Sequence, residues 1–465
     1  MAAVVPVTVT SAVTQHVRPG FLGLSLETRG VEGYTGTDPD NVNPVFEQLI
    51  RNLDPGQHPV LRIGGDTGDW SWYPVRGMSR PLGVRYSLTP TWLGVVKALA
   101  RAVNGRLILA VNLEANSTRV AAAEARAFIS GIGSPWLQAL QLGNEPELYD
   151  VLAWYAVNDK PVLGRPSSWS LSSYLSDYAT IARSLPDYPL AGPEVGARVW
   201  VDGIGQFLDS EPRVRIVTVH RYALGCIPEK PATVSSLLSD TYTRDFTAGL
   251  GAALEAAHVH GLPIRLDEMQ TVSCGGQTGL SDTFAAALWD LDVSFETAQR
   301  GFNGVNFHTR EGIANQLFTF AHRHGTWSAR VSPDYYGLLM FAQAAPAGSA
   351  LLGVDGPTSG PLHLWATRAP NGTVRAILIN MALKSGRTIA LRGPTSPRAV
   401  TVERLTAPSV GAKGGVTLGG RAFASGTKTG LLTGRPRTIS IPRSRNGSYS
   451  VWVPPASAAI VTFSR

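Results

Sequence analysis

Hydrophobic and polar positions follow one repeated arrangement from about residue 21 to residue 341. A short apolar run is followed by a polar loop and then by a segment with helical periodicity. Eight of these runs are expected to be strands, over residues 21–25, 60–63, 107–111, 139–142, 190–192, 216–219, 264–266 and 305–307. Helices are expected between them, for example over residues 91–104 and 118–129. This arrangement is typical of consecutive βα units.

Eight such units over roughly 320 residues predict a closed (β/α)₈ barrel. A doubly wound parallel sheet is the alternative that the same pattern leaves open. In enzymes with this fold, the catalytic residues lie at the carboxyl ends of the barrel strands. Functional residues are therefore expected in the loops that follow the eight strands.

The pattern changes after residues 335–339, which are expected to belong to the last barrel helix. Gly, Pro, Ser and Thr become frequent, and no helical period survives. Short alternating runs are expected to form an antiparallel β-sandwich, with strands over residues 374–379, 388–391, 399–404, 438–441 and 450–453. The opening residues 5–13 alternate as well. The predicted division is therefore an N-terminal strand for the sandwich in 1–17, the barrel in 18–342 and the sandwich in 343–465.

Composition agrees with a folded, catalytic or binding protein. Of 465 residues, 44% are hydrophobic and 16% are charged, which leaves too little charge for disorder. No apolar run approaches the roughly 18 residues of a membrane span. The net charge of +7 comes from scattered residues, with short clusters only at 435–437 and 443–445. A solvated basic surface is therefore expected, and nucleic-acid binding is not.

Two carboxylates stand at the ends of predicted strands. Glu145 follows the fourth strand in Asn144-Glu145-Pro146, and Glu268 ends the seventh. Alone, either could be a solvated loop residue or a charge at a helix N-terminus. Together they are expected to face one pocket at the same rim. Cleavage of a glycosidic bond needs such a pair, and a separation near 5 Å indicates retention whereas a wider gap indicates inversion.

Longer motifs around this pair resemble a known family. The Asn-Glu-Pro sequence and Glu268 resemble the clan of retaining (β/α)₈ glycosidases. Within that clan, residues 21–27, 61–66 and 280–287 (FLGLSLE, LRIGGD and LSDTFAAA) resemble glycoside hydrolase family 79, the β-glucuronidase and heparanase family. The trailing sandwich with its N-terminal strand also fits that family. The resemblance implies that Glu145 is the general acid/base and Glu268 the nucleophile.

Other residues at the rim are expected to bind substrate. Asn144 is expected to hydrogen-bond the sugar 2-hydroxyl, with a helix cap as the alternative. The resemblance implies that Tyr222 orients Glu268 and that His220 lines the floor, although either could be a packed core residue. Glu27, after the first strand, is expected to bind hydroxyls at the non-reducing end, which favours exo action.

The identity of the sugar depends on a second set of residues. Family members that act on glucuronides use a Tyr and glycine amides after the nucleophile to hold the carboxylate, and here Ser273 stands in place of the Tyr while Gly275 and Gly276 remain. Asp66, after paired glycines that let the backbone approach a ligand, would repel a carboxylate if it pointed at carbon six. The expected substrate is a β-D-glucuronide, with a β-glucoside or a diglycoside released whole as alternatives.

Two cysteines lie in neighbouring rim loops. Cys226 follows the sixth strand and Cys274 the seventh, so a disulfide is expected, with two free thiols as the alternative. A disulfide would imply an oxidising, secreted or extracytoplasmic location. Residues 1–5 lack the charged segment and apolar run of a secretion signal, so this location is inferred from the cysteines alone.

Other classes of function fit less well. A silent carbohydrate-binding barrel should have lost its catalytic carboxylates, and both are present. The histidine pairs at 258/260 and 322/324 lack neighbouring carboxylates, so a metal-dependent hydrolase is not expected. No glycine-rich dinucleotide fingerprint occurs, and no cofactor is expected. The expected partner is a β-linked glycoside, and the oligomeric state is left open.

Overall fold

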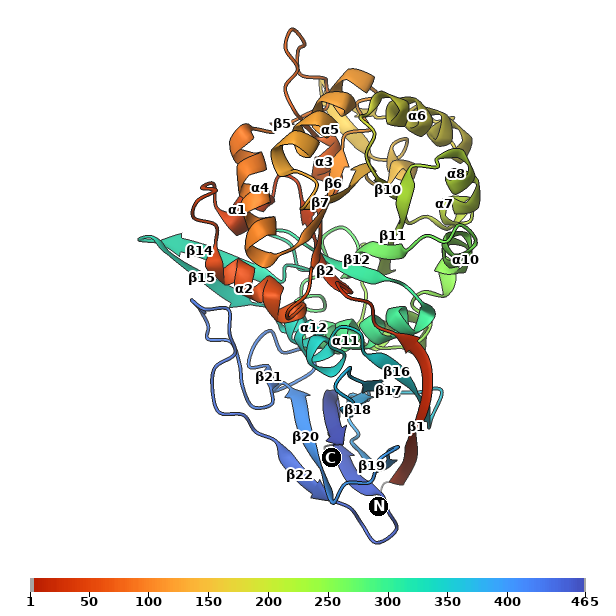
Figure 1. Ribbon diagram of the computed structural model, residues 1–465, viewed down its shortest axis with the longest axis vertical. Helices are drawn as coiled ribbons and strands as arrows, with labels where there is room; N and C mark the ends of the chain where they lie inside the picture. The colour runs from red at the N-terminus through yellow and green to blue at the C-terminus, as the bar shows by residue number, and fades with distance from the viewer. Residues whose placement is uncertain (1–3, 464–465) are drawn as a thin grey trace.

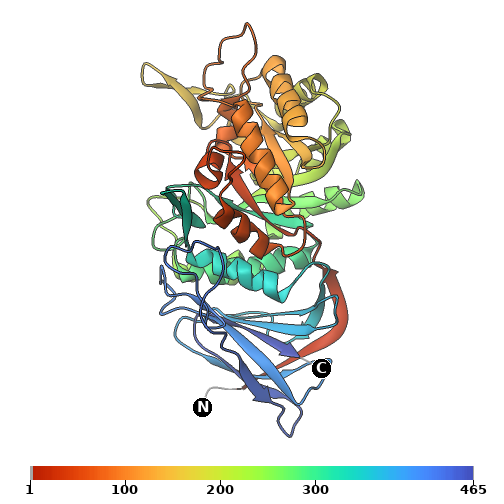
Figure 2. The same cartoon turned by 60° about the vertical axis from the view of Figure 1, so that its left-hand side comes forward.

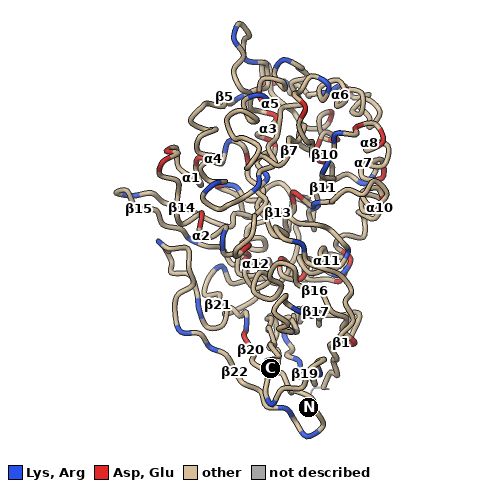
Figure 3. The backbone as a smooth tube through the Cα atoms, in the orientation of Figure 1, with Lys and Arg blue, Asp and Glu red and all other residues tan. Residues whose placement is uncertain are grey.

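The computed structural model describes residues 4–463, which form a barrel and a sheet domain. Figure 1 shows the barrel in the upper part and the blue sheet domain below it, with both chain termini at the lower end. None of the described helices is long and apolar enough to cross a membrane. Lys and Arg are spread along the backbone of both parts of the molecule (Figure 3).

Eight parallel strands close the barrel, as the sequence predicts. They are, in barrel order, β2 (Leu22–Glu27), β3 (Val60–Gly64), β6 (Arg106–Val111), β7 (Leu137–Leu142), β10 (Leu190–Val195), β11 (Val214–Leu224), β12 (Ile264–Val272) and β13 (Gly304–Thr309). The last strand pairs with the first in the register Val305 to Leu22. That pairing closes the ring and excludes the doubly wound sheet.

Helices surround the barrel and fill the loops between its strands. The α-helices are α1 (Val31–Thr35), α2 (Pro44–Leu53), α3 (Asp66–Asp69), α4 (Pro90–Val103), α5 (Thr118–Ile132), α6 (Leu171–Ser184), α7 (Arg198–Val201), α8 (Ile204–Ser210), α9 (Val234–Leu237), α10 (Gly251–Val259), α11 (Phe284–Arg300) and α12 (Pro333–Ala344). Short 3₁₀ turns are η1 (Pro146–Leu148), η2 (Asp240–Tyr242) and η3 (Ala248–Leu250). Thr89 and Ser117 cap α4 and α5 by accepting backbone N–H bonds, which sets where these two predicted helices begin.

Three two-stranded ribbons extend from the barrel loops, and the sequence pattern did not reveal them. They are β4 (Ser71–Trp72) with β5 (Tyr86–Ser87), β8 (Ala153–Val157) with β9 (Lys160–Leu163), and β14 (Phe318–Arg323) with β15 (Thr326–Val331). The first two ribbons follow strands β3 and β7, so they stand at the rim where the two glutamates lie.

The second domain is one sheet that curls around its own core. Its strands are β1 (Val4–His16), β16 (Ala350–Asp355), β17 (Leu362–Arg368), β18 (Val374–Asn380), β19 (Arg387–Arg392), β20 (Ala399–Thr406), β21 (Thr417–Leu418), β22 (Ile439–Pro442), β23 (Tyr449–Val453) and β24 (Ser457–Phe463). Side chains from both halves, such as Val9, Val400 and Tyr449, share one apolar cluster, as in a sandwich.

Strand β1 ties the beginning of the chain to its end. It pairs antiparallel with β16 and parallel with β19, so the mainly antiparallel sheet contains one parallel pair. The red strand beside the blue sheet in Figure 2 shows this arrangement. Helices α11 and α12 lie between barrel and sheet, where Asp292 of α11 accepts hydrogen bonds from the ring nitrogens of His363 and Trp365, both at 2.7 Å.

Candidate active site

The structure brings the two predicted glutamates together at the carboxyl ends of the barrel strands. Glu145 follows β7, and Glu268 lies within β12. One carboxylate oxygen from each and one ring nitrogen of His220 all lie within 4.8 Å of one another. The side chain of Glu145 is 22% exposed and that of Glu268 is 7% exposed, so solvent reaches the first more easily than the second.

An unusual backbone conformation aims Glu145 into the pocket. Its φ of 44° and ψ of 57° lie in the left-handed region, which costs a residue with a Cβ of order 1 kcal/mol. Its backbone N–H donates to the carbonyl of Glu194 at 3.0 Å, and Pro146 begins η1 directly afterwards. These contacts fix the backbone at Glu145 and with it the direction of the carboxylate. The sequence pattern did not predict this conformation.

Glu268 is surrounded by donors and positive charge. Tyr222 donates its hydroxyl to Oε1 at 2.8 Å, and the Arg62 guanidinium donates to Oε2. Nδ1 of His308 lies 3.6 Å from the same Oε2. Burial alone would raise the pKa of Glu268, but the charges of His308, Arg62 and His220 together with the Tyr222 hydrogen bond outweigh it and hold the pKa well below its usual range. Glu268 is therefore ionised.

Arg62 hydrogen-bonds several side chains of the site, although the sequence did not predict a role for it. Its side chain is fully buried on β3. Nε donates to Gln141 at 3.0 Å, and Nη2 donates to Asn144 at 2.7 Å and to Glu194 at 3.3 Å. A charge inside the apolar run Leu61-Arg62-Ile63 was the available signal, because buried charges need partners.

His220 links the acid/base candidate to a deeper carboxylate. Nδ1 lies 3.2 Å from Oε1 of Glu145, and Nε2 lies 3.2 Å from Oε2 of Glu194. Burial would lower the pKa of His220, but the charge of Glu268 and the hydrogen bonds with Glu145 and Glu194 raise it well above its usual value. The imidazolium form is therefore favoured.

Glu194 and Asp267 form a carboxyl pair beneath His220, and neither was predicted. Burial acts to raise the pKa of Glu194, but His220 and Arg62 lower it below its usual value. Burial and the charge of Glu194 raise the pKa of Asp267, and neither carboxyl oxygen of Asp267 accepts a hydrogen bond from the described residues 4–463. Of the two carboxyl groups, Asp267 is therefore the more readily protonated and Glu194 the more readily ionised.

Asn144, Asp66 and Glu27 line the opposite wall. Nδ2 of Asn144 donates to Oδ1 of Asp66 at 3.0 Å, and no side-chain cap bonds the N-terminus of η1, so Asn144 is not a helix cap. Oε2 of Glu27 accepts from the N–H and hydroxyl of Thr67 at 3.0 and 2.6 Å. Although Asp66 touches solvent, the surrounding protein and then the charges of Glu27, Glu145 and Glu268 raise its pKa.

The loop after β12 contains the predicted disulfide. Cys226 and Cys274 are bonded, with their Cα atoms 6.0 Å apart, which confirms the pairing. Oγ of Ser273 accepts the N–H of Cys226 at 3.1 Å, and the N–H of Gly276 donates to the carbonyl of Ser273 at 3.1 Å. Gly275 and Gly276 have φ of 87° and 88°, where side chains are strained.

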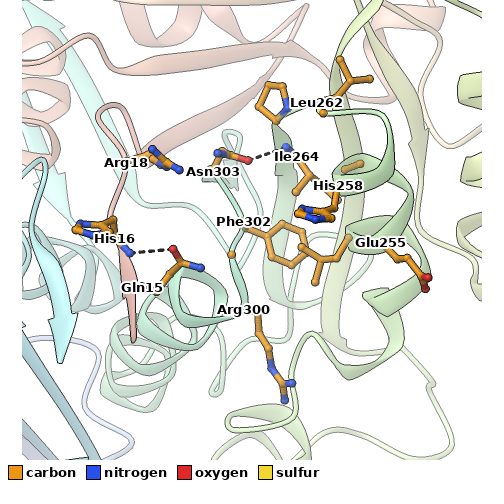
Figure 4. A pocket seen from close by; sticks show the side chains of 15 residues that line it. Gln15, His16, Arg18, Glu255, His258, Leu262, Ile264, Arg300, Phe302 and Asn303 are labelled. Carbon is orange, nitrogen blue, oxygen red and sulfur yellow. Dashed lines mark hydrogen bonds between the residues drawn. The ribbon is translucent and has the colours of Figure 1, made fainter. Parts of the chain in front are cut away.

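Two cavities distinguish the ends of the barrel. One of about 330 Å³ lies beside Glu145 and is walled by Asp66, Trp70 and Trp154. The other cavity, of about 710 Å³, is lined by the end of β1, by α10 and by the loops that follow α10 and α11 (Figure 4). Its single carboxylate is Glu255, so it lacks the pair that the chemistry requires.

Metal sites also combine carboxylates with an imidazole, and two such groups of side chains include His220. Glu145, His220 and Glu268 form one close group, and Glu194, His220 and Asp267 form another. Both groups depend on the same imidazole, and the Arg62 guanidinium already bonds Glu268 and Glu194. The positive charge that these carboxylates require is thus supplied by the chain itself.

Comparisons with known proteins agree with this geometry. Residues 364–460 match the family model described as the glycosyl hydrolase family 79 C-terminal beta domain. A β-glucuronidase from Neurospora crassa is 23% identical over 86% of this chain and 79% of its own length. A β-glucuronidase from Aspergillus niger is 22% identical over 95% of this chain and 90% of its own length.

Solved structures share the whole fold. The 4-O-α-L-rhamnosyl-β-D-glucuronidase of Fusarium oxysporum superimposes with a TM-score of 0.77 at 20% identity, covering 99% of each chain. An α-L-arabinofuranosidase from Thermotoga maritima has a TM-score of 0.68 at 12% identity, also over 99% of each chain. The barrel, the sandwich and these relatives together identify the chain as a glycoside hydrolase that is similar to β-glucuronidases and whose C-terminal domain matches that of family 79.

Proposed function

We propose that the protein is a retaining exo-β-glucuronidase in which Glu145 is the general acid/base and Glu268 the nucleophile. The observation that carries the proposal is the approach of the two carboxylates, with one oxygen of each inside a 4.8 Å group. Retaining enzymes keep these groups about 5–5.5 Å apart, whereas inverting enzymes leave about 6.5–9.5 Å for a water molecule.

The environments of the two glutamates suit different roles. The ionised, donor-surrounded Glu268 attacks the anomeric carbon and forms a glycosyl ester as the C–O bond to the leaving group breaks. Glu145, which is more open to solvent, gives its proton to the departing oxygen. It then takes a proton from the water that hydrolyses the ester, so the enzyme returns to its starting state.

Asn144 and Asp66 place the sugar within this mechanism. If Asn144 binds the 2-hydroxyl, then Asp66, which accepts from the Asn144 amide, lies toward that side of the ring and away from carbon six. Its raised pKa further favours the neutral acid. The repulsion that a glucuronate carboxylate would meet at Asp66 is thereby reduced, which supports the glucuronide over the glucoside.

The non-reducing end is assigned to the wall at β2. Glu27 is held by Thr67, and Nε2 of His308 lies 3.6 Å from its Oε1, so a sugar hydroxyl would find both a donor and an acceptor there. A second candidate is cleavage of a capped glucuronide, because the Fusarium neighbour is named a rhamnosyl-glucuronidase. The disulfide supports an oxidising, extracytoplasmic location.

The mechanism is tested with an aryl β-glucuronide. Glu268→Gln should reduce kcat at least about 10⁴-fold, since it removes the nucleophile without changing shape. Azide should rescue Glu145→Ala, because it attacks the glycosyl ester without a general base. Glu255→Gln, an exposed change at the far end of the barrel, is the matched control. Full activity in Glu268→Gln would refute the assignment.

Substrate choice is tested by parallel assays. Nitrophenyl β-glucuronide, β-glucoside and a rutinoside-type diglycoside should be compared by kcat/KM on the same preparation. The proposal expects the glucuronide to lead. A preference of more than about tenfold, or ~1.4 kcal/mol, for the glucoside would reject the glucuronidase assignment while leaving the glycosidase assignment intact.

A further inference from the structure

Arg310 stands at the rim just beyond the end of β13. Alternate residues of this strand face the barrel interior: the Asn306 amide bonds Arg265, and the His308 ring lies 3.6 Å from Oε2 of Glu268. The same alternation directs the next such residue, Arg310, to the level above His308. Nη2 of Arg310 lies 3.6 Å from where a Cβ on Gly275 would be, so the guanidinium reaches the loop after the nucleophile.

The Arg310 guanidinium is half-buried and has no partner of its own. Within residues 4–463, its side chain makes no hydrogen bond and no ion pair. Arg62 and Arg265, the other arginines inside the barrel, each bind several acceptors. Five donors without acceptors beside an active site indicate a group that is completed by a ligand.

The loop after β12 is short of donors for a carboxylate. The Gly276 N–H is already bonded to the Ser273 carbonyl, and Ser273 Oγ, which accepts from the Cys226 N–H, has only its hydroxyl hydrogen to donate. Both glycines pack closely against other residues, since a Cβ would lie 2.8 Å from Ile313 and 2.6 Å from Asn315. Only the Gly275 N–H remains free among the amides of this pair.

We propose that Arg310 binds the C6 carboxylate of a β-D-glucuronide and determines the preference for an acidic sugar. The inference rests on the proposed function. A guanidinium presents two parallel N–H groups to a carboxylate, and the Gly275 N–H adds a third donor from the neighbouring loop. Arg310 thus adds charged donors to a loop that otherwise offers the Gly275 N–H and the Ser273 hydroxyl.

The charges of the pocket agree with this role. Asp66 and Glu145 line the cavity beside the site, and Arg62 is already paired with Glu194 and Glu268. Arg310 makes no ion pair with another of the residues 4–463, so its charge is available to the carboxylate of an acidic sugar.

The test compares two substrates in one variant. Arg310→Ala should lower kcat/KM for nitrophenyl β-glucuronide about 10- to 100-fold, the range for a hydrogen bond to a charged group. It should change kcat/KM for the β-glucoside less than about threefold, since that sugar has no carboxylate. Arg310→Lys should recover part of the glucuronide activity. Inhibition by free glucuronate should weaken in parallel with the loss in Arg310→Ala.

Arg29→Ala is the matched control. Arg29 is also a rim arginine, but its guanidinium donates to the Tyr86 hydroxyl at 2.9 Å and stacks on that ring. If the loss came only from removing a positive charge near the rim, both variants would be affected alike. An equal fall of kcat/KM for the glucuronide in Arg29→Ala would therefore overturn the proposal. Thermal melts check that each variant is folded.

The outcomes separate the inference from the function on which it rests. If the native enzyme hydrolyses the glucuronide and Arg310→Ala retains full activity, or loses both substrates equally, Arg310 is not the carboxylate site and the proposed function stands. If the native enzyme hydrolyses the glucoside at least tenfold better than the glucuronide, the proposed substrate fails and the inference fails with it.

Discussion

Two buried arginines, Arg62 and Arg265, occupy the same barrel at opposite ends. Arg62 on β3 lies under the carboxyl ends of the strands, among Glu268, Glu194 and Asn144. Arg265 near the start of β12 donates to the Asn306 amide oxygen and to the carbonyls of residues 20 and 21 at 2.9 and 3.1 Å. At the carboxyl ends of the strands, ionised carboxylates balance the charge of Arg62. At the other end, uncharged carbonyl and amide oxygens accept the hydrogen bonds of Arg265.

The difference appears in the two guanidinium groups. Burial lowers the pKa of both, but the charges of Glu268 and Glu194 reverse the effect for Arg62, whose pKa is raised. For Arg265, burial outweighs Asp54 and Asp267 and lowers the pKa to about 10. The structure around Arg62 therefore depends on several charged groups that shift one another's pKa. The structure around Arg265 depends on hydrogen bonds to uncharged oxygens. Removing a cation should have different consequences at the two ends.

The largest effect is expected from Arg62→Gln. It leaves Glu268 and Glu194 buried without their cation, which costs about 3–5 kcal/mol of stability. The same loss removes the guanidinium that orients Glu268 and Asn144, so kcat/KM should fall about 10³-fold. Steady-state kinetics and thermal melts measure the two effects. A variant with native kinetics would show that the carboxylates do not share this cation.

Arg265→Gln should instead lower stability without a comparable loss of catalysis. Carbonyl and amide oxygens left without donors cost about 1–3 kcal/mol. Because Arg265 makes no contact with Glu145 or Glu268, kcat/KM of the folded variant should stay within about threefold of native. Chemical denaturation and kinetics at a temperature where both proteins are folded check this. A kinetic loss equal to that of Arg62→Gln would remove the contrast between the ends.

Asp54, near Arg265, should make stability depend on pH. Burial raises its pKa to about 7, while Arg265 only partly lowers it. The folded state thus holds a proton that the unfolded state has lost above about pH 4, so stability falls as pH rises from about 4 to 7. Asp54→Asn should be more stable than native by about 4 kcal/mol at pH 8 and no different at pH 3.5. Denaturation at the two pH values tests this, and equal differences would contradict it.

The smallest effect is expected from Tyr222→Phe. The hydroxyl that donates to Glu268 helps to keep the pKa of that carboxylate low. Its loss should raise the pKa, so the acidic limb of the kcat/KM profile should move to higher pH, and kcat should fall about tenfold. A tenfold loss without any shift of that limb would point to substrate positioning and not to the nucleophile's charge.

The fold followed from sequence because its signals are local and repeated. All eight barrel strands begin within two residues of their expected positions, although β11 and β12 continue five and six residues beyond their expected ends. Alternation and turn residues likewise located the strands around Ile377, Ile389 and Val402 in the sandwich. The rim ribbons escaped because short two-stranded elements carry too few residues for a clear period.

The site was predictable only where a residue stood in a recognisable motif. Glu145 shortly follows β7 and Glu268 lies within β12, each in a recognisable motif, and the structure brings them together. Arg62, Glu194 and His308 lie inside strands whose neighbours are apolar, so their partners become visible only when distant strands meet. Their roles depend on long-range contacts that local patterns do not encode, although an unpaired charge in a buried strand was a usable warning.

The pairing of β1 has a consequence for synthesis of the chain. Thr10 binds Gly353, a partner 343 residues later. At about 5–20 residues per second, the first strand leaves the ribosome roughly 20–70 s before its partners exist. During that interval its alternating apolar side chains and open backbone edge are exposed to pairing with other nascent chains. β1 is thus made well before the strands with which it pairs and is among the last segments to be folded, so chaperone supply during translation is expected to affect the yield of this protein.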